Sequence, residues 1–302
     1  MNVKADCLKG CVRMNVLLLL ACGLLISLTY ALGKLATQAG VEGIELLFWQ
    51  ISGSVLIVLP SAWWAGQLPK LQKDHMRYYT LAGLMGFTGP YLITYWVLNY
   101  IPSGLVGVVA SLSPLLTFAI VLILFRGKAN FSSGLGLVLG FAGVLAILLP
   151  KNSLPSPEMF IWVLLACASP LLLAIGNVYR TRAWPANGKP LQMAAGLLTS
   201  QWALLLPVYA VTQPVGLPTQ ALFTVMSIAV VSGFFYLISF ELQRRTTPVF
   251  VGQLGYVIAL CSLLIGILFF NETPSLWVWA GAALIAGGVY WVSNGKSVGG
   301  TA

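Results

Sequence analysis

Charged side chains are scarce in this chain. Asp, Glu, Lys and Arg make up 8% of its 302 residues, whereas soluble domains carry roughly 25%. So few charges cannot cover a surface that faces water, and lipid must therefore be the main solvent of the folded chain. The seven acidic residues and one histidine do not cluster within the apolar segments, which argues against paired-carboxylate or metal-dependent catalysis. We therefore expect neither an enzyme nor a bound cofactor or metal.

Other absences narrow the class of protein further. The chain lacks the Gly-x4-Gly-Lys-Ser/Thr loop that cradles nucleotide phosphates, so we expect no ATP-driven activity. It has no long loop or appended soluble domain, which disfavours a receptor or scaffold. Nothing in it resembles an ion-selectivity filter, although that absence alone does not exclude a channel.

Long apolar runs dominate the sequence, which is 59% hydrophobic. A helix crosses the hydrocarbon core of a bilayer with about 20 apolar residues, and short gaps with Pro, Gly or Asn separate runs of that size. The sequence therefore predicts an all-α integral membrane protein with ten transmembrane helices. These are expected near 14–37, 44–65, 76–98, 103–125, 132–149, 159–180, 190–212, 220–242, 248–270 and 276–293.

The basic residues predict the orientation of the chain. Fourteen of the sixteen Lys and Arg residues fall in the two tails and in alternate gaps, and the other gaps hold only Lys151. Short loops rich in Lys and Arg remain in the cytoplasm. The tails 1–13 and 294–302 are therefore expected in the cytoplasm, and the helices in the cell inner (plasma) membrane. Beside apolar helices, the net charge of +9 suits anionic lipid headgroups rather than nucleic acid. Met14 opens the first apolar run and is a candidate start.

The two halves of the chain are similar to each other. A shift of 145 residues, without gaps, matches 12 of the 55 positions from Tyr91 to Leu145. Each half has five helices, an odd number, so the halves enter the membrane from opposite sides. We expect one repeat at 14–150 and another at 151–293, with a solute site near the midplane between them. Matched pairs include Tyr91 with Tyr236, Gly136 with Gly281, and Gly143 with Gly288.

Two stretches, one in each half, carry the most recognisable motifs. Tyr95 to Leu149 includes Pro102-Ser103 and Ser111-Leu112-Ser113-Pro114-Leu115, and Tyr256 to Val292 includes Phe270-Asn271-Glu272. These motifs resemble the drug/metabolite transporter superfamily, in its EamA-type branch, over essentially the whole chain. The resemblance implies ten helices in two five-helix repeats. It also implies a secondary carrier, commonly an exporter of amino acids or other small metabolites, in the bacterial inner membrane.

Some positions depart from the family pattern. Gly127 stands where relatives often have an acidic residue that closes the fourth helix, whereas the second copy keeps Glu272. Gln50 stands where an arginine is common in the second helix. A charge that serves relatives is therefore missing from this chain.

Polar residues within the apolar segments predict the solute site. In hydrocarbon, such side chains are costly and face a cavity or the interior of the bundle, and several recur here at helical spacing. For any one tyrosine, ordinary packing explains the position about as well as cavity lining does. The predicted solute-binding residues are Tyr30, Lys34, Tyr91, Tyr95, Asn99, Asn177, Tyr236, Gln253 and Tyr256.

Lys34 is the sharpest single candidate, because it is the only base well inside a predicted span. One explanation is a counter-charge for an anionic group such as a carboxylate. The other is a snorkelling side chain, or one paired with Glu45 or Glu42 at the outer surface. The family places a lysine near this point, which slightly favours the first explanation.

Two further features have competing explanations. Glu241 precedes Arg244 and Arg245 by three and four residues, which is the spacing of a local ion pair on a helix; proton coupling is the alternative. Gly136 and Gly140 form a GxxxG pattern that lets helices approach closely. We expect packing between the repeats there, and a homodimer seam is the alternative.

The sequence therefore predicts a secondary transporter of small polar metabolites, most simply an exporter of amino acids. It would work by alternating access through a central cavity between the repeats. Its partners would be a small-molecule solute and the lipid bilayer. A membrane channel, or a membrane protein with no transport role, is the alternative.

Overall fold

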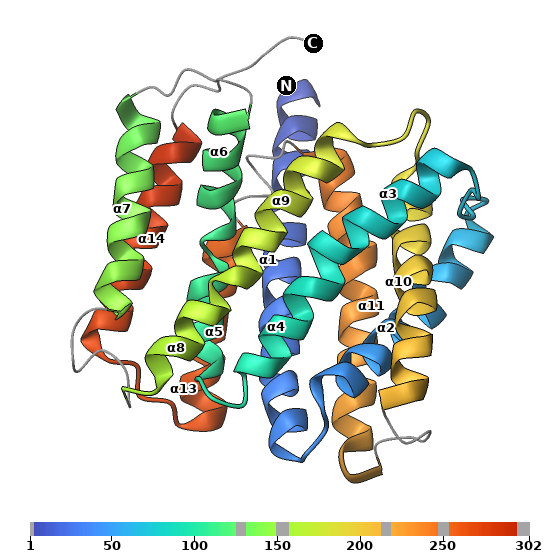
Figure 1. Cartoon of the computed structure of the whole chain (residues 1–302). Coiled ribbons are helices and arrows are strands. Elements are labelled where there is room, and N and C mark those ends of the chain that lie inside the picture. Colours follow the sequence, from blue (N-terminus) through green and yellow to red (C-terminus); the bar gives the residue numbers. More distant parts are fainter. Residues whose placement is uncertain (1–2, 125–130, 149–156, 213–218, 247–253, 295–302) are drawn as a thin grey trace.

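The chain folds into a bundle of helices (Figure 1). The computed structural model describes residues 3–124, 131–148, 157–212, 219–246 and 254–294, and within these ranges it has no strand. Ten segments cross the bundle in turn, which confirms the predicted all-α membrane fold. In order they are α1 (Val3–Gln38); α2 (Gly43–Trp64); α3 (Lys73–Gly83) with η1 (Leu84–Thr88) and α4 (Gly89–Val97); α5 (Ser103–Ala110) with α6 (Ser113–Leu124); α7 (Phe131–Leu148); α8 (Met159–Ala166) with α9 (Ala168–Arg182); α10 (Pro190–Thr212); α11 (Leu222–Arg245), preceded by η2 (Thr219–Ala221); α13 (Leu254–Phe270); and α14 (Leu276–Asn294).

The helices follow the apolar runs, with one difference at the start. In the described ranges, six helical stretches are long and apolar enough to cross a membrane by length and composition alone. The first of these is Met14–Gln38, as expected, but α1 itself begins at Val3. Helix-forming Lys, Ala and Leu precede Met14 and no proline interrupts them, so the helix extends into the predicted tail.

Three crossing segments are interrupted shortly before a proline in the sequence. Proline lacks an N–H and clashes with the preceding turn, but it fits the first turn of a new helix. The new helices α4, α6 and α9 accordingly hold Pro90, Pro114 and Pro170 in their first turns. The π-helical turn η1 comes directly before the first of these restarts, and such turns are frequent at functional sites.

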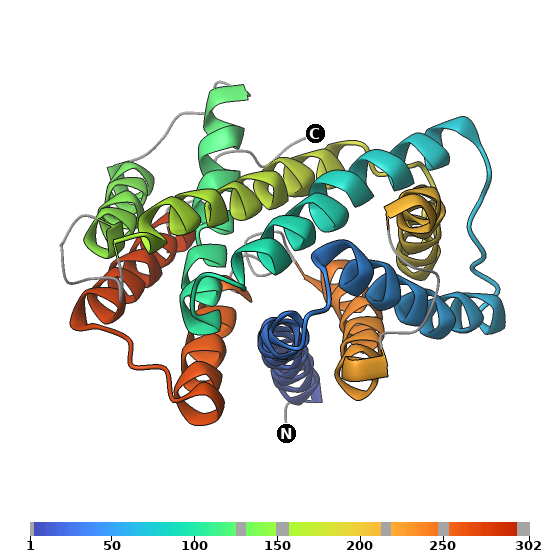
Figure 2. The same ribbon diagram turned by 60° about the horizontal axis from the view of Figure 1, so that its bottom comes forward.

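The packing of the helices repeats itself about a two-fold axis. Exchanging the first five crossing segments with the last five carries each principal contact either onto itself or onto another principal contact. The contacts α7–α14, α2–α10 and α5–α13 join equivalent segments of the two halves. The contact α1–α11 corresponds to that of α9 with η1 and α4, α1–α13 corresponds to α6–α9, and α2–α11 corresponds to α3–α10. The two inverted five-helix repeats therefore interlock across the bundle (Figures 1 and 2).

Glycines hold α7 and α14 together at the edge of the bundle. A Cβ on Gly143 would lie 2.7 Å from the carbonyl oxygen of Gly281, and one on Gly288 would lie 2.5 Å from that of Gly136. In the sequence repeat Gly143 matches Gly288 and Gly136 matches Gly281, so these two contacts are equivalent. Backbones approach this closely only where no side chain intervenes. The GxxxG pattern is thus used within the chain, between its repeats.

Gly288→Val is therefore expected to destabilise the protein by about 1–3 kcal/mol, because the added side chain overlaps the backbone of α7. Gly287→Val is the matched control, since a Cβ on Gly287 meets nothing within 4 Å. The measurement is the fraction of monodisperse protein left after heating in detergent. Equal losses in both variants would contradict the glycine seam.

Candidate functional site

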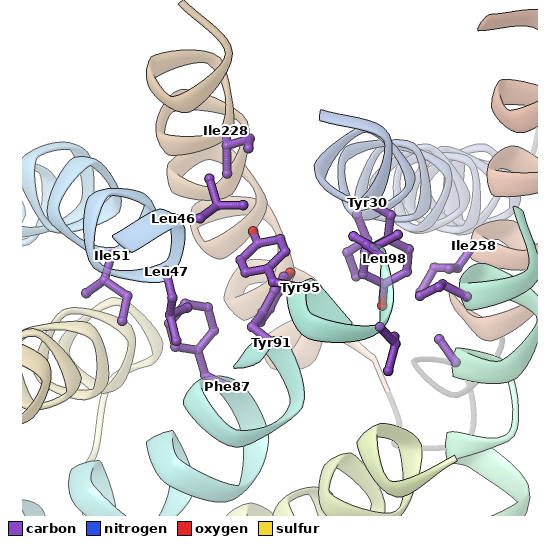
Figure 3. Close-up of a cluster of buried hydrophobic side chains, with 14 of the residues drawn as sticks. Tyr30, Leu46, Leu47, Ile51, Phe87, Tyr91, Tyr95, Leu98, Ile228 and Ile258 are labelled. Atoms are coloured by element: carbon purple, nitrogen blue, oxygen red, sulfur yellow. The ribbon is translucent and has the colours of Figure 1, made fainter. Parts of the chain in front are cut away.

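Four tyrosines from both repeats meet inside the bundle, and we term them the tyrosine cluster. They are Tyr30 in α1, Tyr91 and Tyr95 in α4, and Tyr236 in α11, and each is at most 9% exposed. The ring centroids of Tyr91 and Tyr95 are 5.7 Å apart. Phe87 in η1 connects the repeats, because its ring lies 5.0 Å from that of Tyr91 and 5.2 Å from that of Tyr236. Figure 3 shows Phe87, Tyr91 and Tyr95 close together, with Tyr30 nearby on α1.

Electrostatic interactions extend the tyrosine cluster beyond its ring contacts. The hydroxyl of Tyr30 lies within electrostatic range of those of Tyr91 and Tyr95. Tyr236 lies within electrostatic range of all three and also of Arg180 in α9. Four of the predicted tyrosines, three from the first half and one from the second, therefore lie near one another, and Tyr91 and Tyr236, which match in the sequence repeat, both contact Phe87.

Gln50 in α2 links the tyrosine cluster to the second repeat. The Tyr95 hydroxyl donates to Gln50 Oε1 at 2.6 Å, and Gln50 Nε2 donates to Ser232 Oγ of α11 at 2.6 Å. Gln50 is 0% exposed and Ser232 is 1% exposed. We term this series of hydrogen bonds, from Tyr95 through Gln50 to Ser232, the Gln50 bridge. It supplies both ends of the buried amide with a partner, as burial in an apolar interior requires.

Lys34 pairs with an acid that follows α13. Its Nζ lies 2.6 Å from Glu272 Oε1 and 4.9 Å from the ring centroid of Phe270. The side chains of Lys34 and Glu272 are 13% and 8% exposed. The partner is thus neither Glu42 nor Glu45, but a residue more than two hundred positions away in the sequence.

Glu272 also caps the N-terminus of α5. Its Oε1 accepts from the backbone N–H of Ser103 at 2.9 Å and from the Ser103 hydroxyl at 3.1 Å, and its Oε2 accepts from the N–H of Gly104 at 3.1 Å. A carboxylate at this end of a helix meets unpaired N–H groups and the positive end of the dipole. The chain turns into this position at Asn271, whose φ of 50° asparagine tolerates better than most residues. Glu272 therefore joins α1, α5 and α13.

The two predicted asparagines have different surroundings. Asn99 is exposed, and its Nδ2 donates to the carbonyl of Trp96 at 3.3 Å, next to the end of α4. Asn177 in α9 accepts a hydrogen bond from Arg180 and donates to Thr117 Oγ1 at 3.5 Å. Among the described residues, Asn177 is linked to the tyrosine cluster through Arg180.

The side chains of two of the remaining predicted residues lie outside what the structure describes, and Glu241 lies in a local ion pair. Gln253 lies outside the described residues, and Tyr256 belongs to α13 but its side chain lies outside them. Arg245 Nε donates to Glu241 Oε1 at 2.5 Å, and these side chains are 40% and 33% exposed. Glu241 thus forms the local pair that its spacing predicts. Among the described residues, no three His, Cys, Asp or Glu side chains gather into a site that could hold a metal.

Sequence reasoning missed Gln50 and Phe87 as members of the candidate site, and Ser232, a polar residue on the same helical stripe as Tyr236, stayed outside the predicted set. The sequence draws attention to Gln50 only as a departure from the family pattern. A buried amide in an apolar helix is itself a signal of a cavity or a polar network, and Ser232 lies one helical turn before Tyr236. Phe87 carries no polar group, so nothing in its residue type distinguishes it from other core residues.

Known proteins resemble this chain along most of its length. The profile of the EamA-like transporter family matches it twice, at residues 13–149 and 160–294. The WAT1-related protein At3g28070 of Arabidopsis thaliana is 21% identical over 303 residues, which cover 87% of this chain and 83% of that protein. A crystal structure of another protein has the same fold, with a TM-score of 0.61 and 19% identity over 90% of this chain and 94% of that chain.

The two family matches fall on the two halves of the helical bundle and confirm the resemblance found in the sequence. They also agree with a multi-pass membrane protein that carries small molecules. The chain belongs to the EamA-like transporter family.

Proposed function

We propose that this transporter exports amino acids or closely related small polar metabolites across the inner (plasma) membrane. It works as a secondary transporter, by alternating access. The observation that carries the proposal is the position of the Gln50 bridge, which runs from Tyr95 in the first repeat to Ser232 in the second. In transporters built from inverted repeats, the solute site lies between the repeats.

The chemistry of the tyrosine cluster supports a solute of this class. Tyrosine hydroxyls both donate and accept hydrogen bonds, and the faces of aromatic rings attract ammonium groups. The four tyrosines and Gln50 are buried, so a solute reaches them only when the helices part. The solute then exchanges its hydrogen bonds with water for bonds to the hydroxyls and the Gln50 amide.

The direction of the chain in the membrane follows from its basic residues. Short loops rich in Lys and Arg remain in the cytoplasm, which places the start of α1 and the end of α14 inside the cell. These two helix ends lie at the same end of the bundle (Figure 1). The α7–α14 contact, fixed by glycines, serves as the pivot about which the repeats rock.

Counterflow in liposomes tests the proposal. Purified protein is reconstituted with an unlabelled solute inside, and uptake of the labelled solute is followed for a panel of amino acids and related metabolites. We expect saturable counterflow of one solute class. Flux that rises linearly with concentration, without counterflow, would favour a channel.

A pH gradient across the same liposomes tests proton coupling. If the gradient drives uptake, and Glu241→Gln removes that dependence while counterflow persists, Glu241 carries the coupling. If counterflow proceeds equally with and without the gradient, the protein is a facilitator.

A further inference from the structure

Arg180, near the end of α9, is a partly buried cation with no acidic partner among the described residues. The ion pairs that the structure gives for described side chains join Lys34 with Glu272 and Arg245 with Glu241, and neither includes Arg180. Arg180 instead donates from Nη2 to Asn177 Oδ1. An arginine has five N–H donors in a planar fork, so one bond to a neutral amide leaves most of that fork and the whole charge available.

Buried tyrosines face Arg180 from two other helices. Tyr78 in α3 and Tyr236 in α11 both lie within electrostatic range of its guanidinium. The ring of Tyr78 also stacks on that of Tyr179, the residue before Arg180, with the ring centroids 6.3 Å apart. Tyr78 is 1% exposed, and its hydroxyl has no hydrogen-bond partner among the described residues. A buried hydroxyl without a partner is costly, so this group is an unused donor beside an uncompensated cation.

Two glycines place Arg180 at the boundary between the repeats. A Cβ on Gly176 of α9 would lie 2.9 Å from the backbone nitrogen of Gly86 in η1, so the two backbones touch. A Cβ on Gly86 would lie 3.7 Å from Arg180 Nε, which puts the guanidinium over the π-helical turn. Figures 1 and 2 show α9 running alongside α3 and α4 in both views.

We infer that Arg180 and Tyr78, with Asn177 holding the guanidinium, form a site for the carboxylate of a transported solute. Arginine binds a carboxylate through two parallel N–H bonds, and the Tyr78 hydroxyl supplies a third donor. Tyr236 interacts with both Arg180 and the tyrosine cluster, so a solute held here extends towards that cluster. Lys34 is already neutralised by Glu272, whereas Arg180 has no acidic partner among the described residues. The inference rests on the proposed function for its biological meaning, but binding can be measured alone.

The test compares benzoate with benzamide, which have the same shape and differ in charge. Both are added to purified protein in detergent at constant ionic strength, and the dissociation constant is taken from the shift in melting temperature. Benzoate is expected to stabilise the wild type and to bind at least about tenfold more weakly to Arg180→Gln, since bonds to a charged group are lost. Benzamide should have little effect on either.

Arg182→Gln is the matched control, because Arg182 is exposed and lies two residues further along the same helix. It should keep the benzoate response, and Arg180→Lys should restore it in part. An equal response to benzoate and benzamide, or full benzoate binding by Arg180→Gln, would overturn the inference. Selective benzoate binding without flux of any solute in liposomes would contradict the transport proposal and leave the Arg180 site standing.

Discussion

Glu272→Ala is expected to lower the free energy of unfolding by about 3–5 kcal/mol, the usual cost of breaking a buried ion pair from one side. The substitution leaves the Lys34 ammonium, at 13% exposure, without its carboxylate. It also leaves the N–H groups of Ser103 and Gly104 at the start of α5 without their acceptor. The measurement is thermal and denaturant stability of the purified protein in detergent.

Glu241→Ala is the control for this prediction. Its ion pair with Arg245 is also short, but the two side chains are 33% and 40% exposed. Water screens such a pair, so its loss should cost less than about 0.5 kcal/mol. Similar losses for Glu241→Ala and Glu272→Ala would show that burial does not set the strength of the Lys34 pair.

The double variant Lys34→Met with Glu272→Gln separates stability from transport. Replacing a buried ion pair with neutral groups of similar volume is often tolerated, and the glutamine still offers one oxygen to Ser103. We expect a folded protein that retains transport, since the structure commits Lys34 to Glu272. Loss of transport in this folded variant would return Lys34 to the solute site as its counter-charge.

The architecture could be predicted from the sequence because it depends on composition and periodicity. A span of about 20 apolar residues forms a helix in a bilayer. Lys and Arg residues occur in every second gap between these spans, and the other gaps hold only Lys151. The inverted repeat followed from the 12 matched positions and the odd number of helices in each half, and the structure brings the matched glycines Gly136, Gly143, Gly281 and Gly288 into contact between α7 and α14. Pro90, Pro114 and Pro170 lie where three segments break, whereas Pro60 and Pro207 lie inside the unbroken helices α2 and α10, so an interruption expected at Pro207 is wrong and proline alone does not predict a break.

The partners of individual polar residues could not be predicted in the same way. Lys34 and Glu272 are 238 positions apart, and Gln50 and Ser232 are 182 apart. Helical spacing predicts which side chains share one face of a helix. It does not predict which other helix that face packs against. For this reason the sequence predicts the tyrosines of α4 and α11 as a set, whereas the acid that pairs with Lys34, and the lack of an acidic partner for Arg180 among the described residues, emerged only from the packing.

Gln50→Leu is expected to lower the transport efficiency of the folded protein by at least about tenfold, measured as Vmax/KM in liposomes. The change leaves the Tyr95 hydroxyl and Ser232 Oγ without the partners they have at 2.6 Å. Each such buried group costs about 1–3 kcal/mol. Leucine also cannot exchange hydrogen bonds with a solute that enters between the repeats.

Gln201→Leu and Tyr95→Phe show whether this loss belongs to the site. Gln201 is also 0% exposed, but it binds Thr88 Oγ1 at 2.7 Å, so its loss should reduce stability without changing the KM for solute. Tyr95→Phe removes the hydroxyl that donates to Gln50. If Gln50 and Tyr95 act as one bridge, the double variant Gln50→Leu with Tyr95→Phe should transport as well as the less active of its two single variants, because the effects of coupled residues do not add. Fully additive losses would mean that Gln50 acts apart from Tyr95, and the bridge would then serve packing rather than solute recognition.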